Sequence, residues 1–272
     1  MISIIIVQYN NPELTRHAIS SLQEQVHGDY EIVLVDNASS DAGSAELVHQ
    51  LKNVIYIRNE VNFGFGKANN IGVQRASGDL LLFLNNDTVT QHDFISPVVT
   101  LFHEDPLIGI AGPRLLNSDM SFQLSAGKLP SISREIYDKC IYYLVDTKYG
   151  YFRARMMKKF STRMNVGWVT GAALFIRKKI FESCAGFDEN YFMYFEDKDL
   201  CARCTELGFK IAYVPDVSLI HLRGASSGER SDRKPRQAYR QSQIYYYRKH
   251  RSVFEQKLLR FYLRLHRVSL ED

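Results

Sequence analysis

The chain alternates between short apolar runs and amphipathic stretches through its first 115 residues. Apolar runs typical of strands cover residues 3–8, 31–35, 53–58, 79–84 and 107–111. Segments with apolar positions at helical spacing lie between them, beginning near Pro12, after Asp41, near Asn62 and at His92. Alternation of this kind gives right-handed βαβ units. We therefore predict an α/β fold with a mostly parallel central sheet flanked by helices.

The pattern becomes less regular beyond this point. Residues 117–165 are rich in tyrosine and basic residues and show no clear period, so we expect an irregular insert. Regular structure is expected to resume with one strand over 168–176, a helix from Glu196 or Asp197 and a short strand over 210–214. One long helix is expected over about 235–268. No apolar run approaches the ~20 residues that a membrane-spanning helix needs.

Two of the buried strands end in acidic residues. The run from Glu31 to Val35 is followed by Asp36, and the run from Leu80 to Leu84 is followed by Asn85-Asn86-Asp87. Ligands of open α/β sheets bind just beyond the carboxyl ends of such strands. These carboxylates therefore indicate a polar ligand that carries a nucleotide or a metal. The simpler alternatives are an Asx turn with a helix cap after Asp36 and an ordinary turn at 85–87.

The segment Asn62-x-Gly64-x-Gly66-x-x-Asn69 imitates a dinucleotide-binding fingerprint. A true match would place its glycines after the first strand, where this chain has Gln8-Tyr9-Asn10 instead. We favour a glycine turn at a helix N-terminus that lets the backbone approach a nucleotide closely. A plain left-handed turn is the alternative.

Two further segments could do chemistry. Glu196 and Asp197 follow the aromatic residues 191–195, and aromatic walls desolvate a carboxylate and raise its pKa, as a general base near neutrality requires. Acids at a helix start are also ordinary caps. His221 precedes Arg223 and a loop of small residues, a set suited to a metal and a phosphate, although a lone histidine is more often structural.

Cysteine usage favours a cytoplasmic protein. The 272 residues include four cysteines and no secretory signal, which indicates a reducing compartment. Cys201-x-x-Cys204 lies within the helix expected from Glu196 and has no second pair at zinc-site spacing. We interpret these two residues as packing thiols rather than as a metal or redox site.

The net charge of +4 hides an asymmetry. Residues 233–268 carry eleven Lys and Arg residues and one acid, whereas the rest of the chain has 23 basic and 29 acidic residues. In the expected helix, one face holds Phe254, Leu258, Phe261, Tyr262 and Leu265, and another holds Lys257, Arg260, Arg264 and Arg267. Such a basic amphipathic helix suits an anionic membrane surface, but it could equally pack on the protein or on a second subunit. Nucleic acid is a weaker option because no binding motif accompanies the bases.

Taken together, the motifs resemble a known family. They are residues 3–10 (SIIIVQYN), 35–41 (VDNASSD), 62–69 (NFGFGKAN), 83–87 (FLNND), 167–172 (GWVTGA) and 186–203 (GFDENYFMYFEDKDLCAR), followed by His221. In this order they resemble family 2 inverting glycosyltransferases of the GT-A fold, especially bacterial rhamnosyltransferase-like members. The resemblance covers residues 1–228 as a catalytic domain, with the 117–165 insert on its acceptor side, and leaves residues 229–272 as a basic helical tail.

The resemblance implies a role for each motif. Asp36 would bind the nucleobase, and the donor site would be completed by Tyr9, Asn62, Gly64, Asn69, Asn85, Asn86 and Arg223. Asp87 would hold a divalent metal, Mg²⁺ or Mn²⁺, with His221 as the second protein ligand; the family's first carboxylate is missing because position 85 is asparagine. Asp197 matches the catalytic base and Glu196 would orient the acceptor or the base. Trp168, Thr170 and Gly171 would line the sugar and acceptor pocket.

The implied reaction is inverting transfer of a sugar from a nucleoside-diphosphate sugar to a hydroxyl of a saccharide or polyprenyl-diphosphate-linked acceptor. dTDP-rhamnose is the leading donor, ahead of a UDP-linked hexose or galactofuranose. The product would be a cell-surface polysaccharide, made in the cytoplasm at the inner face of the membrane, with a homodimer as one assembly. The competing class is a non-catalytic protein that binds a sugar nucleotide or, less in keeping with the sequence, nucleic acid.

Overall fold

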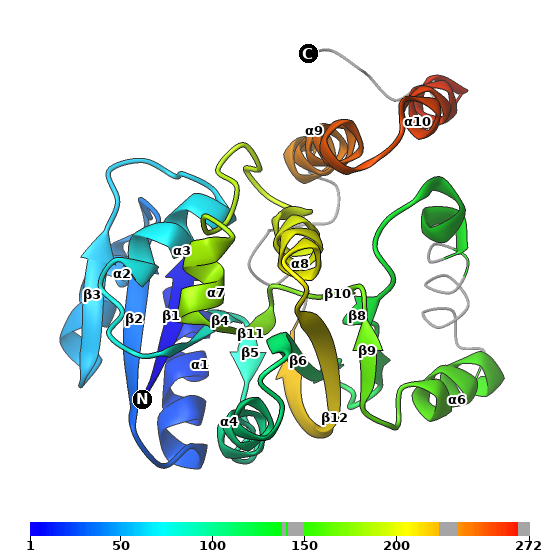
Figure 1. The fold of residues 1–272 in the computed structure, drawn as a ribbon. Helices are drawn as coiled ribbons and strands as arrows, with labels where there is room; N and C mark the ends of the chain where they lie inside the picture. The colour runs from blue at the N-terminus through cyan, green and yellow to red at the C-terminus, as the bar shows by residue number, and fades with distance from the viewer. Residues whose placement is uncertain (138–139, 141–149, 223–232, 266–272) are drawn as a thin grey trace.

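The computed structural model describes residues 1–137, 140, 150–222 and 233–265 (Figure 1). Its centre is a ten-stranded sheet in the order β3-β2-β1-β4-β11-β6-β12-β5, with β7 beside β6 and β9 beside β12. The strands are β1 (Ile2–Gln8), β2 (Tyr30–Asp36), β3 (Val54–Arg58), β4 (Leu80–Asn85), β5 (Thr88–Val89), β6 (Ile108–Leu116), β7 (Phe122–Gln123), β9 (Met164–Val166), β11 (Ala173–Arg177) and β12 (Lys210–His221). A separate two-stranded sheet pairs β8 (Ala126–Gly127) with β10 (Trp168–Val169). The predicted mostly parallel sheet is confirmed.

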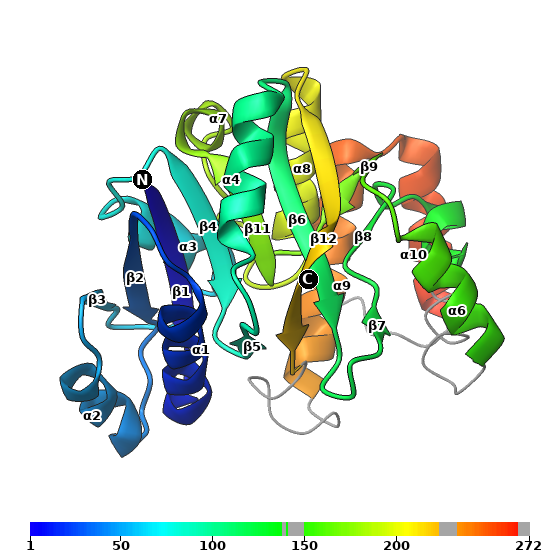
Figure 2. The ribbon, with the colours of Figure 1, turned by 90° about the horizontal axis from the view of Figure 1, so that it is seen from below.

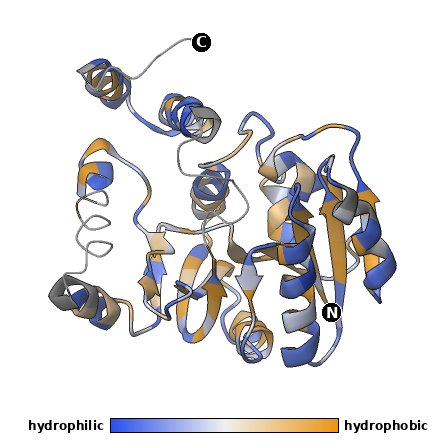
Figure 3. Cartoon of the chain, turned by 180° about the vertical axis from the view of Figure 1, so that it is seen from behind, coloured by the Kyte–Doolittle hydropathy of each residue, from blue (hydrophilic) through white to orange (hydrophobic). Residues whose placement is uncertain are grey.

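Helices cover both faces of this sheet (Figures 1 and 2). The helices are α1 (Pro12–Gln25), α2 (Ala42–Gln50), α3 (Phe65–Val73), α4 (Ile95–Glu104), α6 (Gly150–Lys159), α7 (Lys178–Ser183), α8 (Glu196–Glu206), α9 (Arg233–His250) and α10 (Val253–Leu265). Of these, α9 and α10 pack on each other and on Tyr191 and Phe195 rather than on the sheet. Side chains of α1, α2 and α4 share one core with Ile4 and Ile6, whereas α3, α7 and α8 share the other with Ile5. Successive residues of β1 thus point to opposite faces, which explains the continuous apolar run of a doubly covered strand. Figure 3 shows the central strands as the most hydrophobic part of the fold.

Two of the strand predictions are wrong in extent. The single strand expected over 168–176 is divided, because Trp168 and Val169 pair with β8 and a turn at 170–172 leads into β11. The strand expected over 210–214 continues to His221 as β12. Pro215 lacks a backbone donor, but a register shift between Val214 and Ser218 lets the pairing with β6 resume. The described part of the predicted insert holds β7, β8, a helical segment at 132–137, α6 and β9.

The tail is not one long helix. It consists of two helices, α9 and α10, which are separated at Arg251 and Ser252 (Figure 1). The Ser252 hydroxyl accepts a hydrogen bond from the backbone N–H of Glu255 (3.3 Å), so Ser252 caps α10. The spacing Ser252-x-x-Glu255 is a capping-box signal that the sequence contains and that the prediction of a continuous helix overlooked. In the described part of the chain, none of the helices combines the length and the apolar character that crossing a membrane requires. The predicted domain boundary at 228 lies outside the described residues.

The tail is fastened to the body by an aromatic cluster and a buried carboxylate. Tyr246 and Tyr247 of α9 pack with Tyr191 and Phe195, beneath Leu259 and Leu263 of α10.

Beside this cluster, the fully buried Asp199 of α8 contacts two cationic side chains and a histidine. Its Oδ2 lies 2.6 Å from Arg203 Nη2, and its Oδ1 lies 2.7 Å from His250 Nε2 and 2.8 Å from Lys249 Nζ. Burial acts to raise the pKa of Asp199, but the hydrogen bond from His250 and the charge of Arg203 outweigh it and hold the pKa below its usual value. The ionised Asp199 therefore links α8 to the end of α9.

We expect Asp199→Asn to lower the free energy of unfolding by about 3 kcal/mol, because it leaves cations buried without their counter-charge. Asp105→Asn is the matched control. Asp105 pairs with Lys210 at 3.1 Å, but both side chains are about a third or more exposed. The control should change stability by less than about 1 kcal/mol. Urea unfolding of both variants measures the difference.

The pH dependence gives a second check on the same group. A folded-state pKa below the ordinary value of about 4 means that the stabilisation is present above that pH and is lost as the pH falls through the folded pKa. Asp199→Asn should therefore unfold with a weaker dependence on pH below about 4 than the unaltered protein. Equal destabilisation by the two substitutions at neutral pH would contradict the role given to Asp199.

Candidate functional site

The carboxyl ends of β2, β1 and β4, together with the amino end of the antiparallel β11, bring the predicted site residues to one edge of the sheet. Gln8 is paired in register with Asp36, and Val7 with Asn85. The backbone N–H of Asn85 donates to the carbonyl oxygen of Ala172 (2.9 Å) in the turn that precedes β11. Neighbouring strands lie about 4.8 Å apart, so the ends of β2, β1, β4 and β11 span about 15 Å.

Asp87 and His221 meet at this edge. Strand pairing brings them together, because the last residues of β12 pair with β5 and align His221 with Thr88, the residue after Asp87. His221 Nε2 lies 3.1 Å from Asp87 Oδ1 and 3.3 Å from Asn85 Nδ2. Asp87 is 1% exposed, so its carboxylate is held away from bulk water. The structure thus joins two residues that are far apart in the sequence.

Gln123 sets the orientation of the His221 ring, and the sequence analysis did not single it out. Gln123 Oε1 lies 2.7 Å from His221 Nδ1, while Gln123 Nε2 donates to Asn117 Oδ1 (2.9 Å) and to the carbonyl oxygen of His221 (3.2 Å). Because the amide nitrogen donates, Oε1 is the acceptor and Nδ1 carries a proton. A metal-binding histidine usually donates its other ring N–H to an oxygen acceptor, and here that acceptor is the Gln123 amide, which has no signature in a single sequence.

The donor set at this point fits a divalent cation. A carboxylate oxygen and an imidazole nitrogen can both act as metal ligands, and Nε2 of His221 and Oδ1 of Asp87 lie 3.1 Å apart. A shared cation satisfies two such groups, and one carboxylate with one imidazole leaves several positions for the oxygens of a diphosphate. No cluster of three or more metal-ligating side chains occurs within residues 1–137, 140, 150–222 and 233–265.

Glu196 and Asp197 begin α8 and lie against the turn between β10 and β11. Asp197 Oδ2 accepts a hydrogen bond from the backbone N–H of Gly171 (3.1 Å), and its Oδ1 accepts one from the N–H of Lys198 (2.8 Å). A Cβ added to Gly171 would lie 3.6 Å from the Cβ of Asp197, so the two chains approach closely. Thr170, Gly171 and Asp197, predicted separately, are therefore neighbours in the structure.

The two adjacent acids have different surroundings. Burial and the neighbouring charge of Asp197 raise the pKa of Glu196 to about 8, so this carboxyl is mostly protonated at neutral pH. Asp197 remains half-buried with backbone donors on both oxygens. A neutral Glu196 can donate a hydrogen bond but cannot accept a proton. Of the two acids, Asp197 is thus the one suited to act as a base.

Lys198 adds a cation that the sequence analysis left out. Its Nζ lies 4.9 Å from the centre of the Trp168 ring and 4.4 Å from that of Phe195. Burial acts to lower the pKa of Lys198, but the charge of Asp197 raises it above its usual value. The predicted pocket residue Trp168 therefore stands beside a charged ammonium group next to Asp197.

Asp36 is fully buried and already engaged by the protein. Its Oδ2 accepts hydrogen bonds from the Tyr56 hydroxyl (2.9 Å) and from Arg58 Nη1 (2.6 Å), and its Oδ1 accepts one from the N–H of Ser39 (2.8 Å). The local turn that served as the simpler interpretation is therefore formed. A carboxylate has about four acceptor positions, so three donors leave one for a nucleobase. Binding of the nucleobase by Asp36 stays a prediction.

The glycine turn at Gly64 approaches another part of the protein. Gly64 has a φ of +80°, and a Cβ there would lie 2.1 Å from the carbonyl oxygen of Phe192. That carbonyl accepts a hydrogen bond from the N–H of Phe65 (2.9 Å). Asn37 supports the turn by donating to Asn62 Oδ1 (2.8 Å). The requirement for glycine therefore arises from the loop that leads into α8.

Other predicted donor-site residues also make contacts within the protein. Asn69 is buried and its side chain donates to the carbonyl oxygen of Phe65 (2.9 Å), and Asn86 donates to the Thr15 hydroxyl (3.0 Å). Tyr9 is exposed directly beyond β1. Arg223 lies outside the described residues. Their roles in donor binding stay predictions.

Comparison with known proteins gives a consistent result. Residues 3–182 match the family model of glycosyl transferase family 2. The N-acetylglucosaminyl-diphospho-decaprenol L-rhamnosyltransferase of Mycobacterium tuberculosis is 26% identical over 240 residues, which is 84% of this chain and 78% of that protein. Rhamnosyltransferase WbbL of Escherichia coli is 29% identical over 234 residues, 81% of this chain and 83% of that protein. The predicted resemblance to rhamnosyltransferase-like members is confirmed.

Solved structures show the same fold. A mannosyltransferase from Pyrobaculum calidifontis in complex with GDP-Man and Mn²⁺ superposes with a TM-score of 0.62 at 16% identity, over 91% of this chain and 63% of that one. GalNAc-T7 with UDP, GalNAc and Mn²⁺ gives 0.61 at 18% identity, over 81% and 43%. The chain thus spans less than two thirds of each of these structures. The likeness confirms the predicted GT-A fold.

Substitution of Gly64 tests the contact between the glycine turn and the loop before α8. Gly64→Ala should lower the free energy of unfolding by at least about 2 kcal/mol, because it adds backbone strain and a collision with Phe192. Gly208→Ala is the control, since Gly208 has a φ of +88° but nothing within 4 Å of an added Cβ. Thermal unfolding should show a larger loss for Gly64→Ala. Equal losses would mean that strain alone requires the glycine.

Proposed function

Because this chain belongs to glycosyl transferase family 2, we propose that it transfers a sugar from a nucleoside-diphosphate donor to an acceptor hydroxyl with inversion at the anomeric carbon. One observation carries the proposal: the Asp87–His221 pair and Asp197 lie at one edge of the sheet, linked through the hydrogen bond between Asn85 and Ala172. A single displacement requires one group that stabilises the charge of the leaving diphosphate and one base that accepts the proton of the attacking hydroxyl.

The donor would lie across the ends of β2, β1 and β4. Asp36 has one acceptor position left for the nucleobase, and the exposed Tyr9 ring is available to contact it. Asn62 and Gly64 border the same edge, and Arg223 follows His221 along the chain, where its charge suits a diphosphate. The backbone groups near Asn85 and Asn86 would lie beside the diphosphate.

Asp87 and His221 would hold Mg²⁺ or Mn²⁺. Such an ion, when bound, neutralises negative charge on the diphosphate leaving group. The chain's own contribution is to hold Asp87 away from water and to keep Nε2 of His221 directed at it through Gln123. Asparagine at position 85 contributes an amide where the family pattern has a carboxylate, so the protein supplies one negative charge fewer.

Asp197 acts as the base. It accepts the proton of the acceptor hydroxyl while that oxygen forms a bond to the anomeric carbon and the bond from this carbon to the diphosphate oxygen breaks. The proton ends on Asp197 and the electron pair on the leaving diphosphate. Gly171 and Lys198 donate backbone hydrogen bonds that hold the carboxylate in place. The protonated Glu196 can donate a hydrogen bond that orients the acceptor, and Trp168 and Thr170 would line the acceptor side of the site.

The relatives favour a particular substrate pair. Two of them are named as rhamnosyltransferases, and one is named for an acceptor with a diphospho-decaprenol carrier. We therefore propose dTDP-rhamnose as the donor and a polyprenyl-diphosphate-linked saccharide as the acceptor, in the synthesis of a cell-surface polysaccharide. A carrier lipid of this kind resides in a bilayer, so the reaction would take place at the inner face of the cytoplasmic membrane.

Substituting the two adjacent acids separately tests the assignment of the base. Asp197→Asn should reduce turnover of dTDP-rhamnose by about 10²–10⁴-fold while donor affinity stays nearly constant, because only proton transfer is lost. Glu196→Gln preserves a neutral hydrogen-bonding group and should keep turnover within about tenfold. Turnover is measured by release of dTDP, and donor affinity by calorimetry.

The reverse order of effects would assign the base to Glu196. Absence of turnover with every activated sugar in a panel, despite tight donor binding, would favour the non-catalytic alternative.

Binding of Mn²⁺ tests the proposed metal ligands without a measurement of turnover. Electron paramagnetic resonance titration in the presence of dTDP should show affinity for Mn²⁺ reduced by at least about tenfold in His221→Ala. Gln123→Leu should reduce it by about 10–100-fold, because it releases the ring orientation. His92→Ala is the control, since His92 is exposed, accepts a hydrogen bond from the backbone N–H of Ser218 (3.3 Å) and is not a proposed ligand. Unchanged affinity in His221→Ala would exclude His221 as a ligand.

A further inference from the structure

The two sides of α10 have opposite environments. Leu259 and Leu263 are buried against the tyrosines of α9, so this side fastens the helix to the body. Phe254, Leu258 and Phe261 point away from that cluster, with Phe254 70% and Phe261 61% exposed. Residues spaced in this way, at i, i+4 and i+7, form one stripe along a helix. An exposed stripe of three large apolar side chains is unusual on a helix that already has a buried side.

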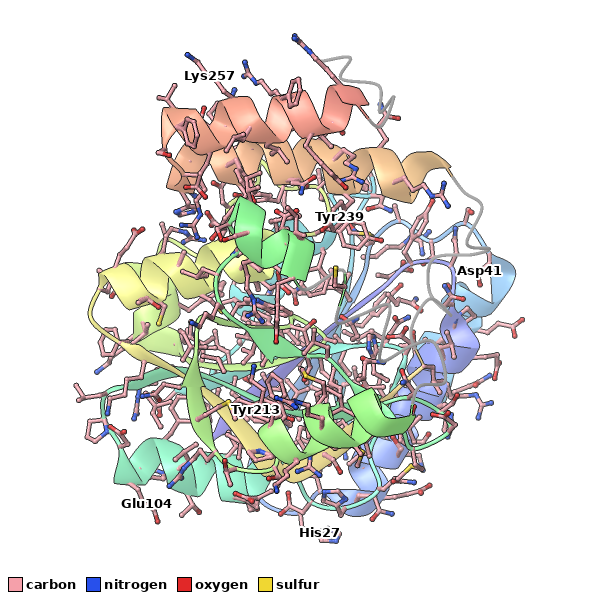
Figure 4. The ribbon with its side chains drawn as sticks, turned by 90° about the vertical axis from the view of Figure 1, so that its right-hand side faces the viewer. His27, Asp41, Glu104, Tyr213, Tyr239 and Lys257 are labelled. Atoms are coloured by element: carbon pink, nitrogen blue, oxygen red, sulfur yellow. The ribbon has the colours of Figure 1, made fainter. Side chains whose placement is uncertain are left out.

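A basic stripe runs beside the apolar one. Lys257, Arg260 and Arg264 are all exposed and lie at i, i+3 and i+7, which also places them in one stripe along the helix. Figure 4 shows Lys257 directed away from the molecule at its outer edge, whereas Tyr239 of α9 lies toward the body. We define the outer face of α10 as Phe254, Leu258 and Phe261 together with these three bases. In α10 the single acidic residue is Glu255.

We propose that the outer face of α10 docks on a bilayer that contains anionic phospholipid. Apolar side chains of an interfacial helix enter the boundary between headgroups and acyl chains, while flanking bases contact the headgroup phosphates. A second copy of this chain fits less well, because a symmetric contact of two outer faces would bring two basic stripes together. The charge pattern therefore selects an anionic partner, and the apolar stripe selects one with an apolar interior.

An acidic residue that Figure 4 labels, Glu104 at the end of α4, lies toward the opposite end of the molecule from α10.

Docking through α10 would also fix the catalytic helix relative to the membrane. The α9–α10 pair is fastened to α8 by Asp199, two residues beyond Asp197. This consequence rests on the proposed function, in which the acceptor carries a polyprenyl chain embedded in the bilayer. With α10 docked on the membrane, Asp197 on α8 would lie at a constant distance from the bilayer surface, where such an acceptor is embedded.

Co-sedimentation with vesicles tests the docking surface independently of turnover. The full chain should bind vesicles of phosphatidylcholine with phosphatidylglycerol, bind phosphatidylcholine alone much more weakly, and dissociate as salt is raised. Phe254→Ser with Phe261→Ser should weaken binding at least about tenfold, since it removes the inserting rings. Lys257→Gln with Arg260→Gln should weaken it roughly 25-fold, about fivefold for each base.

Leu107→Ser is the matched control, because Leu107 is 53% exposed and follows α4, away from the tail. It should bind vesicles as the unaltered protein does, and circular dichroism should show all variants folded. Vesicle binding that is indifferent to both double substitutions would overturn the proposal. So would an outer face that mediates self-association, seen as a dimer by light scattering that both double substitutions dissociate.

Turnover with a short-chain, water-soluble acceptor separates this proposal from the proposed function. The double variants should retain that turnover and lose it selectively with an acceptor embedded in vesicles. If the unaltered protein binds vesicles but transfers no sugar to either acceptor, the docking surface stands and the proposed function fails. If it transfers sugar to the soluble acceptor but does not bind vesicles, the docking proposal fails alone.

Discussion

The insertion of β11 between β4 and β6, antiparallel to both, is the constraint on which the candidate site depends. Its direction places the turn at 170–172 beside the end of β4, where the N–H of Asn85 donates to the carbonyl oxygen of Ala172. The same turn supplies the N–H of Gly171 to Asp197. A parallel strand in this position would present its other end to the edge, and Asp197 would then lose its contact with the strands that carry Asp36 and Asp87.

The first turn of α8 holds three acids, and the fold treats each one differently. Asp199 is paired with Arg203 and Lys249 and also contacts His250. Glu196 is buried and carries a proton at neutral pH. Asp197 alone remains half-buried and bound by backbone N–H groups. Three carboxylates within four residues would otherwise repel one another, so the tail contributes to the site by taking up the charge of Asp199.

The metal-binding candidates depart from the family pattern at position 85, and the structure shows which side chains surround His221 as a result. Asparagine replaces the first carboxylate, and its amide lies 3.3 Å from Nε2 of His221. Gln123 orients the His221 ring through its other nitrogen, Nδ1. Asp87 and His221 are thus positioned by two amides rather than by a second acid. The relatives that support a glycosyltransferase match over most of the chain, and therefore include the segments that supply Asp87, Asp197 and His221.

The sequence by itself determined the order of strands and helices, the polar strand ends and the family, because apolar period and local motifs are properties of short segments. It left out what depends on contacts between distant segments. Gln123 orients His221, and Gly64 is required by the Phe192 carbonyl, yet no local pattern links these pairs. Only the tertiary structure decided which side of α10 is buried. The helix has two apolar stripes, and the sequence does not say which of them packs against α9.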